Sequence, residues 1–347
     1  MKQISLKEYR ETFFDDSRLP EDELTLYLAE RADYRLPRRK AVSHKYSYGR
    51  ALIIGGSTGF SGAPVLAANA CERSGAGLTQ LFVPDSIYTI AASRCDGAVV
   101  RPVPGTKDGA ISERAIDSIL PALKQADACV IGPGLGTGEE AAKLVEAVLG
   151  EAVCPVVLDA DAITICGRNP ELLNICQAPV ILTPHEGEFK RLGGDLSAGR
   201  LAGAVGYSRT HESLILVLKG YGTLICRGES VTVNPTGSPA MAKGGSGDVL
   251  CGILCALLAQ GFEPLFSAKC AVYLHGLAGD LACAENGEYS VTPSDMIRFL
   301  PQAFMRISHC QPNEETLAAL LEAERIAKDP AVKGYTNMEA LLSDLRE

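Results

Sequence analysis

Short runs of β-branched and aliphatic residues alternate with alanine-rich segments of helical period along most of this chain. Six such runs lie at 51–54, 78–83, 128–132, 155–160, 180–183 and 214–220. Strands that are separated by helices run in the same direction, so this alternation predicts an α/β fold with a central, mostly parallel sheet covered by helices on both faces. Ligands of such sheets bind at the carboxyl ends of the strands, where the loops of this chain are rich in glycine.

The composition argues against several classes of function. Of the 347 residues, 46% are hydrophobic, which is enough for a large core. A formal net charge of −9 argues against a nucleic-acid-binding surface, because phosphate backbones require clustered Lys and Arg. The longest apolar segment, 249–259, is too short to cross a bilayer, and the N-terminus lacks the pattern of a signal peptide. We therefore expect a cytoplasmic protein that binds neither nucleic acid nor membranes.

The cysteines do not form a recognisable framework. There are 12 of them, scattered among apolar runs and without a C-x-x-C pair. The histidines add no metal-binding spacing. The pattern predicts buried, reduced thiols and no metal centre built from side chains.

The stretch at 243–261, KGGSGDVLCGILCALLAQG, predicts a glycine loop that enters a buried helix. The start of a helix leaves several N–H groups unpaired and partially positive, and glycines let an anion approach the backbone closely. The loop is therefore a candidate phosphate-binding site. Asp248, in the first turn, either caps the helix or acts as a catalytic base beside a phosphoryl group, and the residues alone leave both roles open.

Six segments, in this order, resemble the NAD(P)H-hydrate dehydratases, which are ADP- or ATP-dependent enzymes of the ribokinase-like superfamily. The last is NPTGSPAMAKGGSGDVLCG, which contains the glycine loop. The segments lie at 44–78, 130–138, 158–164, 181–192, 217–225 and 234–252, so that the resemblance covers about residues 44–305. It implies a ribokinase-like α/β fold.

The resemblance also implies a lyase reaction that repairs hydrated NADH or NADPH. In that reaction a nucleotide phosphorylates the ring hydroxyl, and phosphate then leaves as the double bond returns. Asp248 is implied to take the hydroxyl proton, while the N–H groups of Gly245, Ser246 and Gly247 form the anion hole. The family's pattern implies Mg²⁺ held largely by nucleotide phosphates and water, with ADP favoured over ATP as the donor. It also implies a homo-oligomer, usually a tetramer.

Other loops match positions that contact the two ligands in the family. The implied nucleotide-binding residues are Lys219, Gly220, Tyr221, Gly222, Thr223 and Gly247. The implied hydrate-binding residues are Ala63, Gly134, His185 and Asp248. Taken alone, 219–223 also fits a plain β-turn and His185 an exposed loop residue. Asp159 and Asp161 either order water or magnesium, or cap a helix.

Two residues depart from the family's pattern. Ser238 stands where Asn is usual, and Lys243 stands where a small residue is usual. The Lys243 side chain either adds a positive charge beside the phosphate-binding loop or points to solvent, and we expect the second.

Three other functions compete with this one. One alternative is a ribokinase-like kinase of a small vitamin alcohol, which shares the fold and the Asp base. An NAD-dependent dehydrogenase is suggested by GGSTGFSGA and Asp85, although these glycines do not form G-x-G-x-x-G. A third alternative is a non-catalytic nucleotide sensor.

The chain is predicted to divide into three regions. These are an N-terminal helical lead-in at 1–43, the ribokinase-like catalytic domain at 44–310 and a charged helical tail at 311–347. The tail resembles the C-terminus of RelB-type antitoxins, which wraps a toxin. Two interpretations stay open for it: a helical hairpin docked on its own protein, or a segment that folds onto a protein partner.

Overall fold

The computed structural model of the chain describes residues 1–15, 25–308, 322 and 325. Residues Met1–Arg35 and Arg39–Ile307 form one compact unit, and the fold given below is that of this unit. The predicted tail at 311–347 lies outside the described residues, apart from Glu322 and Arg325, whose side chains form an ion pair. Its two interpretations stay predictions.

The centre of the unit is a sheet with the strand order β1-β2-β11-β10-β9-β8-β7-β6-β3-β4-β5. The strands are β1 (Lys2–Ile4), β2 (Thr25–Leu28), β3 (Arg50–Ile54), β4 (Leu78–Pro84), β5 (Val99–Val103), β6 (Ala128–Ile131), β7 (Val156–Leu158), β8 (Val180–Leu182), β9 (Leu214–Leu218), β10 (Leu224–Arg227) and β11 (Ser230–Val233). The strands from β9 to β5 in this order pair in parallel. Strand β10 is antiparallel to both β9 and β11.

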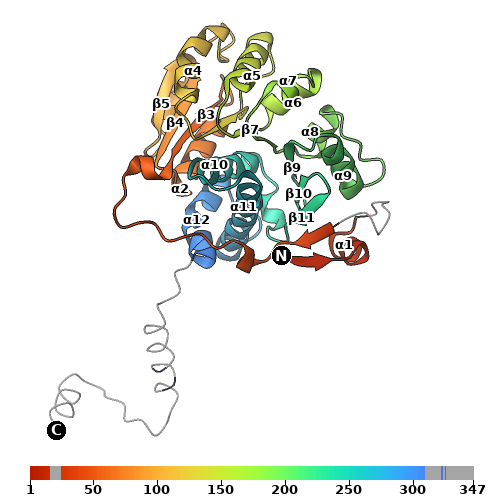
Figure 1. The fold of residues 1–347 in the computed structure, drawn as a ribbon. Helices are drawn as coiled ribbons and strands as arrows, with labels where there is room; N and C mark the ends of the chain where they lie inside the picture. The colour runs from red at the N-terminus through yellow and green to blue at the C-terminus, as the bar shows by residue number, and fades with distance from the viewer. Residues whose placement is uncertain (16–24, 309–321, 323–324, 326–347) are drawn as a thin grey trace, which may run out of the picture. The chain divides into compact units, whose positions relative to one another are not determined.

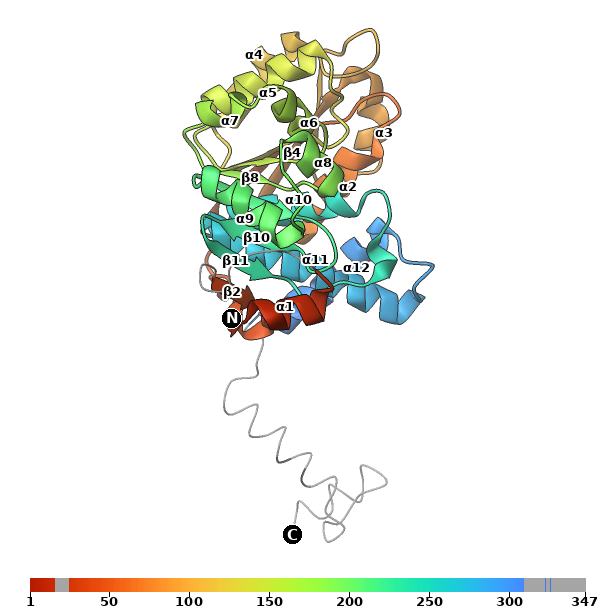
Figure 2. The same ribbon diagram turned by 90° about the vertical axis from the view of Figure 1, so that its right-hand side faces the viewer.

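Helices cover both faces of this sheet (Figures 1 and 2). On one face lie α2 (Gly62–Arg73), α10 (Ser246–Ala259), α11 (Pro264–Asn286) and α12 (Pro293–Ile307). On the other lie α4 (Ile116–Leu123), α5 (Glu139–Glu151), α6 (Asp161–Arg168), α7 (Leu172–Ile175), α8 (Glu186–Arg191) and α9 (Arg200–Thr210). The remaining helices are α1 (Leu6–Phe13) and α3 (Tyr88–Ala92). The predicted α/β class, with a mostly parallel sheet covered on both faces, is confirmed.

The central strands are buried because side chains on both of their faces meet helices. Leu52 and Ile54 of β3 belong to the core on the α4–α9 side, whereas the alternate residues Ala51 and Ile53 point to the other face and are at most 1% exposed. This burial explains why each strand reads as a continuous apolar run instead of an alternating one. All six predicted runs coincide with strands of the sheet.

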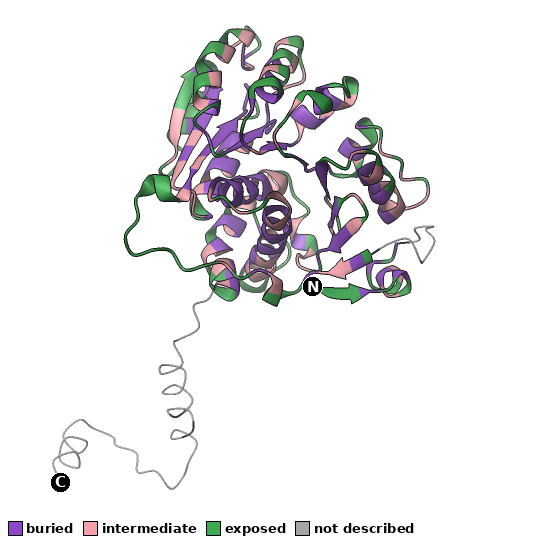
Figure 3. Cartoon of the chain, viewed as in Figure 1, coloured by how far each residue is buried: buried purple, intermediate pink, exposed green. Residues whose placement is uncertain are grey.

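Helix α10 is the most deeply buried helix at the site described below. Every residue from Val249 to Ala259 is buried, as Figure 3 shows for this helix. It begins directly after Gly245 and is followed by Gly261, whose φ of 83° is one that glycine adopts readily. The prediction of a glycine loop that leads into a buried helix is confirmed. Within the described residues, no helix combines the length and the apolar character that a membrane span requires.

The N-terminal lead-in differs from its prediction, because it is not only helical. Besides α1 it contains β1 and β2, and β2 pairs in parallel with β11. Leu26 of β2 is 1% exposed, so this pairing adds to the core. Strands of three and four residues give too short a pattern to recognise, and the partner of β2 lies about 200 residues further along the sequence.

Candidate active site

Three neighbouring strands end in polar residues that meet at one edge of the sheet. Asp159 follows β7, Thr183 follows β8 and Lys219 follows β9. The Lys219 ammonium lies 2.8 Å from Asp159 Oδ1, and the Thr183 hydroxyl donates to the same oxygen at 2.7 Å. Glu188, from the first turn of α8, places Oε2 3.8 Å from Lys219 Nζ. Because parallel strands end at a common edge, residues 60 positions apart form one charged cluster.

The Asp159–Lys219 pair is charged although it is buried. Burial alone would raise the pKa of Asp159, but the neighbouring Lys219 and its hydrogen bond hold that pKa below its usual value. Burial alone would lower the pKa of Lys219, but Asp159 beside it raises that pKa instead. The side chain of Asp159 is 3% exposed and that of Lys219 is 19% exposed, so each charge depends on the other.

The glycine loop approaches this charged pair closely. A Cβ on Gly247 would lie 3.1 Å from Lys219 Nζ. At Gly245, where φ is 96°, a Cβ would lie 2.7 Å from Leu66 Cδ1 and 2.9 Å from Pro293 Cγ. Larger side chains would therefore displace the loop, and the N-terminus of α10 opens beside the Lys219 ammonium. Backbone N–H groups and a lysine at one point suit a phosphate group.

Asp248 lies in the first turn of α10. Among the residues that the structure describes, none hydrogen bonds or ion pairs with it. It does not cap the helix, because Gly245 is the N-cap residue and no side-chain cap bond is formed. Burial, with the negative Asp159 nearby, raises the pKa of Asp248 to about 7, against the opposing charge of Lys219. A carboxylate with this pKa is suited to accept a proton near neutral pH.

Two predicted hydrate-binding residues, Ala63 and Gly134, come together across the ends of β3 and β6. A Cβ on Gly134 would lie 3.5 Å from Ala63 Cβ and 2.8 Å from the Phe60 carbonyl oxygen. Gly134 has φ of 61°, and its carbonyl accepts from Ser57 Oγ at 2.9 Å. Only glycine fits this conformation and this spacing.

His185 is the N-cap of α8. Its Nδ1 accepts from the N–H groups of Gly187, at 2.9 Å, and Glu188, at 3.3 Å. The proton of a neutral ring would therefore be on Nε2, which lies 3.4 Å from Glu188 Oε1; the side chain is 56% exposed. The backbone of His185 forms a parallel bridge with Lys219. His185 thus combines a structural role with a ring nitrogen that is able to donate to a ligand.

The predicted nucleotide loop, 219–223, connects the antiparallel strands β9 and β10. Thr223 Oγ1 donates to the Gly220 carbonyl at 2.9 Å and closes the turn. Arg200 donates to the carbonyls of Leu218, Lys219 and Tyr221. The loop is a β-hairpin turn, which agrees with the prediction of a β-turn at 219–223. It also places Lys219 in contact with Asp159 of the charged cluster.

Lys243 is exposed, as expected, but its side chain does not extend freely into solvent. Its ammonium donates to the carbonyls of Tyr289, at 2.7 Å, and Val291, at 2.6 Å. Both carbonyls belong to the segment that connects α11 and α12. The two hydrogen bonds of Lys243 therefore join the glycine loop to this segment. Ser238, the other departure, has a buried hydroxyl without a hydrogen-bond partner in the described part of the chain.

Asp161 has a structural partner: its carboxylate accepts from Gly136 N at 2.8 Å, which holds the loop after β6. Among the described residues, no group of three or more His, Cys, Asp or Glu side chains is placed so that it could hold a metal ion. Any cation at this site would therefore need further ligands from a bound molecule or water.

The sequence pattern does not identify every residue of the cluster. Glu188 and Thr183 lie inside segment 181–192, but their roles follow only from the contacts of Glu188 with Lys219 and of Thr183 with Asp159. The pattern gives no signal for His275 on α11. Burial lowers its pKa to about 4, against a hydrogen bond with the backbone of Ser246, so this ring is neutral and lies against the glycine loop.

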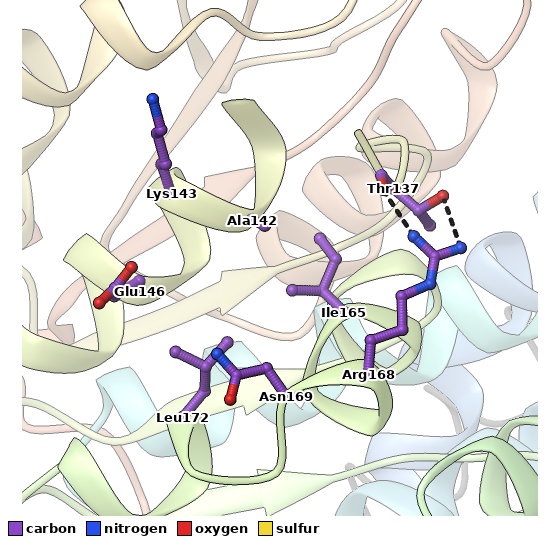
Figure 4. Close-up of a pocket in the computed structure, with 8 residues that line it drawn as sticks. All are labelled: Thr137, Ala142, Lys143, Glu146, Ile165, Arg168, Asn169 and Leu172. Atoms are coloured by element: carbon purple, nitrogen blue, oxygen red, sulfur yellow. Dashed lines mark hydrogen bonds between the residues drawn. The ribbon is translucent and has the colours of Figure 1, made fainter. Parts of the chain in front are cut away.

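A small cavity lies away from this cluster, beside α5 and α6 (Figure 4). Its volume is about 150 Å³, and it contains none of the predicted site residues. In it Arg168 donates to the carbonyl of Thr137, at 2.8 Å, and to its hydroxyl, at 3.4 Å. These bonds hold the loop that also contains Gly134. The residues that line the cavity therefore stabilise a loop of the site, and the cavity itself is not the proposed active site.

Solved structures with this fold include a ribokinase-like superfamily protein from Enterococcus faecalis, with a TM-score of 0.72 and 29% identity over 85% of this chain and 99% of that one. Another is described as ADP/ATP-dependent NAD(P)H-hydrate dehydratase from Bacillus subtilis, co-crystallised with ATP/Mg²⁺. Its TM-score is 0.67, with 31% identity over 80% of this chain and 96% of that one. The expected ribokinase-like fold is confirmed.

Sequence relatives agree with these structures. The bifunctional NAD(P)H-hydrate repair enzyme Nnr of Moorella thermoacetica is 39% identical over 82% of this chain and 54% of its own length. The enzyme of the same name from Gloeobacter violaceus is 40% identical over 75% of this chain and 51% of its own. The chain thus spans about half the length of these curated relatives. The family described as NAD(P)H-hydrate dehydratase matches residues 51–302, a range that contains every predicted site residue, and the chain belongs to this family.

Proposed function

We propose that this chain catalyses the nucleotide-dependent dehydration of hydrated NADH and NADPH. The single observation that carries this proposal is the Asp248 carboxylate in the first turn of α10, which has no partner within the described ranges and lies beside the glycine loop and Lys219. The B. subtilis relative that is described as a dehydratase is covered over 96% of its length. Family membership favours this reaction over a vitamin-alcohol kinase, a dehydrogenase or a nucleotide sensor.

The proposed reaction has two steps. Asp248 accepts the proton of the ring hydroxyl as that oxygen attacks the terminal phosphorus of the donor, and the bond from phosphorus to the departing nucleotide breaks. The C–O bond of the phosphorylated ring then breaks, so phosphate leaves with the former hydroxyl oxygen, and a ring proton is lost as the double bond returns. The N–H groups of Gly245, Ser246 and Gly247 would stabilise the charge on the moving phosphoryl group.

The two ligands would approach Asp248 from different loops. We assign the donor to residues 219–223 together with Gly247, with Lys219 directed at its phosphates. Ala63, Gly134 and the Nε2–H of His185 would contact the hydrated cofactor. The supporting observations are that Gly134, His185 and Lys219 follow β6, β8 and β9, and that Ala63 lies at the start of α2, after β3. A Cβ on Gly247 of α10 would lie 3.1 Å from Lys219 Nζ, and a Cβ on Gly245 would lie 2.7 Å from Leu66 of α2.

Magnesium fits this arrangement only as a companion of the donor. Asp159 is already bonded to Lys219 and Thr183, and Asp161 to Gly136. We therefore propose that donor phosphates and water supply most of the ligands of Mg²⁺, which would neutralise phosphate charge. The neighbouring carboxylates would orient its water.

We further propose a homo-oligomer, because the family that the chain resembles is usually tetrameric, and a cytoplasmic location, as the sequence pattern predicts. Light scattering should then give a mass well above the 36.7 kDa of one chain. A mass equal to one chain at the working concentration would contradict the oligomer without affecting the proposed reaction.

The proposal is tested by incubating the protein with hydrated NADH, Mg²⁺ and either ADP or ATP. We expect the near-ultraviolet absorbance of the reduced nicotinamide to return, and we expect ADP to be the better donor. A rate with ATP about tenfold above that with ADP would reverse the donor assignment. No recovery with either nucleotide, under conditions in which the B. subtilis relative is active, would contradict the function.

The rate should also depend on pH, because Asp248 has to be deprotonated to accept a proton. With its pKa near 7, kcat/KM is expected to rise as the pH increases through about 7 and then to level off. The measurement is kcat/KM for the hydrate from about pH 5 to about pH 9, with Asp127→Asn, at the opposite edge of the sheet, as a control that keeps the inflection. A flat profile through this range would argue against Asp248 as the base.

A further inference from the structure

The 219–223 loop packs on a side chain from the start of the sequence. Phe13, the last residue of α1, is 7% exposed, and its ring centroid lies 5.7 Å from that of Tyr221. A Cβ on Gly222 would lie 2.5 Å from Phe13 Cδ1, and the φ of Gly222 is 59°. The Phe13 ring therefore occupies the space next to Gly222. Both the volume of this ring and the backbone conformation at 222 require glycine there.

Helix α1 is fixed in this position by its own polar contacts. Its N-cap, Ser5, accepts from Glu8 N at 3.1 Å. Directly after Phe13 the chain leaves the helix, and the buried Asp15 carboxylate accepts from the Tyr9 hydroxyl at 2.7 Å and from Leu201 N at 3.2 Å. Leu201 lies in the first turn of α9, so the end of α1 is bonded to that helix.

The same turn of α9 holds the nucleotide loop. Arg200, the residue before Leu201, donates to carbonyls at 218, 219 and 221, and it forms an ion pair with Glu186 at 2.9 Å. Consecutive residues of α9 thus bind the loop and the end of α1. Tyr221 is 64% exposed, so its ring contacts Phe13 while much of its surface stays open to a ligand.

We propose that Phe13 is a positioning residue for the nucleotide donor. It holds Tyr221 and Gly222 in the conformation that the donor requires, so the N-terminal segment is part of the donor site although it precedes the family match at 51–302. The inference rests on the proposed function, because it needs the donor to bind at 219–223. Phe13 would influence donor binding and leave the chemistry at Asp248 unchanged.

The test is a calorimetric titration of the full chain with ADP and with ATP, in the presence of Mg²⁺. We expect Phe13→Ala to raise the Kd and KM of the donor about tenfold, which corresponds to about 1.4 kcal/mol, while kcat and the KM of the hydrate change less than about twofold. Phe13→Leu should recover much of this loss because it refills the space against Gly222. Leu6→Ala, which truncates another buried side chain of α1, is the matched control and should keep the donor Kd within about twofold of wild type.

Each outcome is informative. If Phe13→Ala does not fold, Phe13→Leu is used instead, and we expect its donor Kd to be raised relative to wild type by less than about tenfold. A wild-type Kd in both Phe13 variants would overturn the inference and leave the proposed function standing. So would an equal loss in Leu6→Ala, because the effect would then belong to docking of the whole segment. If the wild-type chain binds neither ADP nor ATP, the proposed function itself fails, and the inference with it.

Discussion

Replacing Asp248 with Asn is expected to leave the fold intact and to lower kcat by a factor on the order of 10² to 10⁴, the usual effect of losing a general base. The reason is local, because Asp248 is the acid of the first turn of α10 and its carboxylate has no structural partner among the described residues. The change is nearly isosteric, so the donor Kd should stay close to that of wild type. The measurement is kcat with saturating donor and hydrate.

Stability provides an independent readout for the same variant. The folded-state pKa of Asp248 is near 7, above the unfolded value of about 3.9, so the native protein binds this proton more tightly than the unfolded chain does. This group therefore lowers wild-type stability as the pH rises through that window. Asp248→Asn should gain stability relative to wild type between about pH 4 and about pH 7. Activity within tenfold of wild type, or a stability difference that does not change with pH, would refute the role given to Asp248.

Removing the charge of Lys219 is expected to have the second large effect. Lys219→Met leaves the Asp159 carboxylate buried without its cation, and breaking a buried pair in this way costs about 3–5 kcal/mol of unfolding free energy. Donor binding should weaken as well, since the ammonium beside Gly247 is lost. Chemical denaturation and donor titration measure the two effects separately.

The sign of the pH dependence identifies the cause. In the wild type the depressed pKa of Asp159 adds stability that is present above its unfolded pKa and is lost as the pH falls through the folded pKa. The deficit of Lys219→Met should therefore shrink in acid. The double variant Lys219→Met with Asp159→Asn should recover most of the stability but not the donor affinity. Lys143→Met, which breaks an exposed ion pair with Glu113, is the control and should cost less than about 1 kcal/mol. An equal cost at both sites would contradict this account.

The sequence predicted the central sheet because its buried strands carry a strong local signal. The runs at 128–132 and 180–183 begin with the apolar stretches ACVI and VIL, which form β6 and β8. The glycine loop and α10 were predictable for a similar reason, since three glycines, one acid and an apolar helix follow each other within 243–261.

The features that the sequence did not reveal depend on contacts between distant residues. The strand β2 is four residues long and is identified only by its pairing with β11. The sequence does not reveal the contacts of Lys243, because the carbonyls that it binds belong to residues more than 40 positions away. The burial of Asp159 was likewise not evident before its contact with Lys219, whereas the short-range motif around Asp248 needed no such contact to be noticed.

In the proposed reaction the ring hydroxyl is phosphorylated before it leaves, and the fate of its oxygen distinguishes this order from direct loss of water. Hydrated NADH that carries heavy oxygen in the ring hydroxyl is incubated with the protein, Mg²⁺ and unlabelled ADP, and the products are examined by mass spectrometry. We expect the label to appear in inorganic phosphate, with one labelled phosphate for each NADH formed, and we expect Asp248→Asn to produce neither. Label released into water, with unlabelled phosphate formed separately, would contradict it.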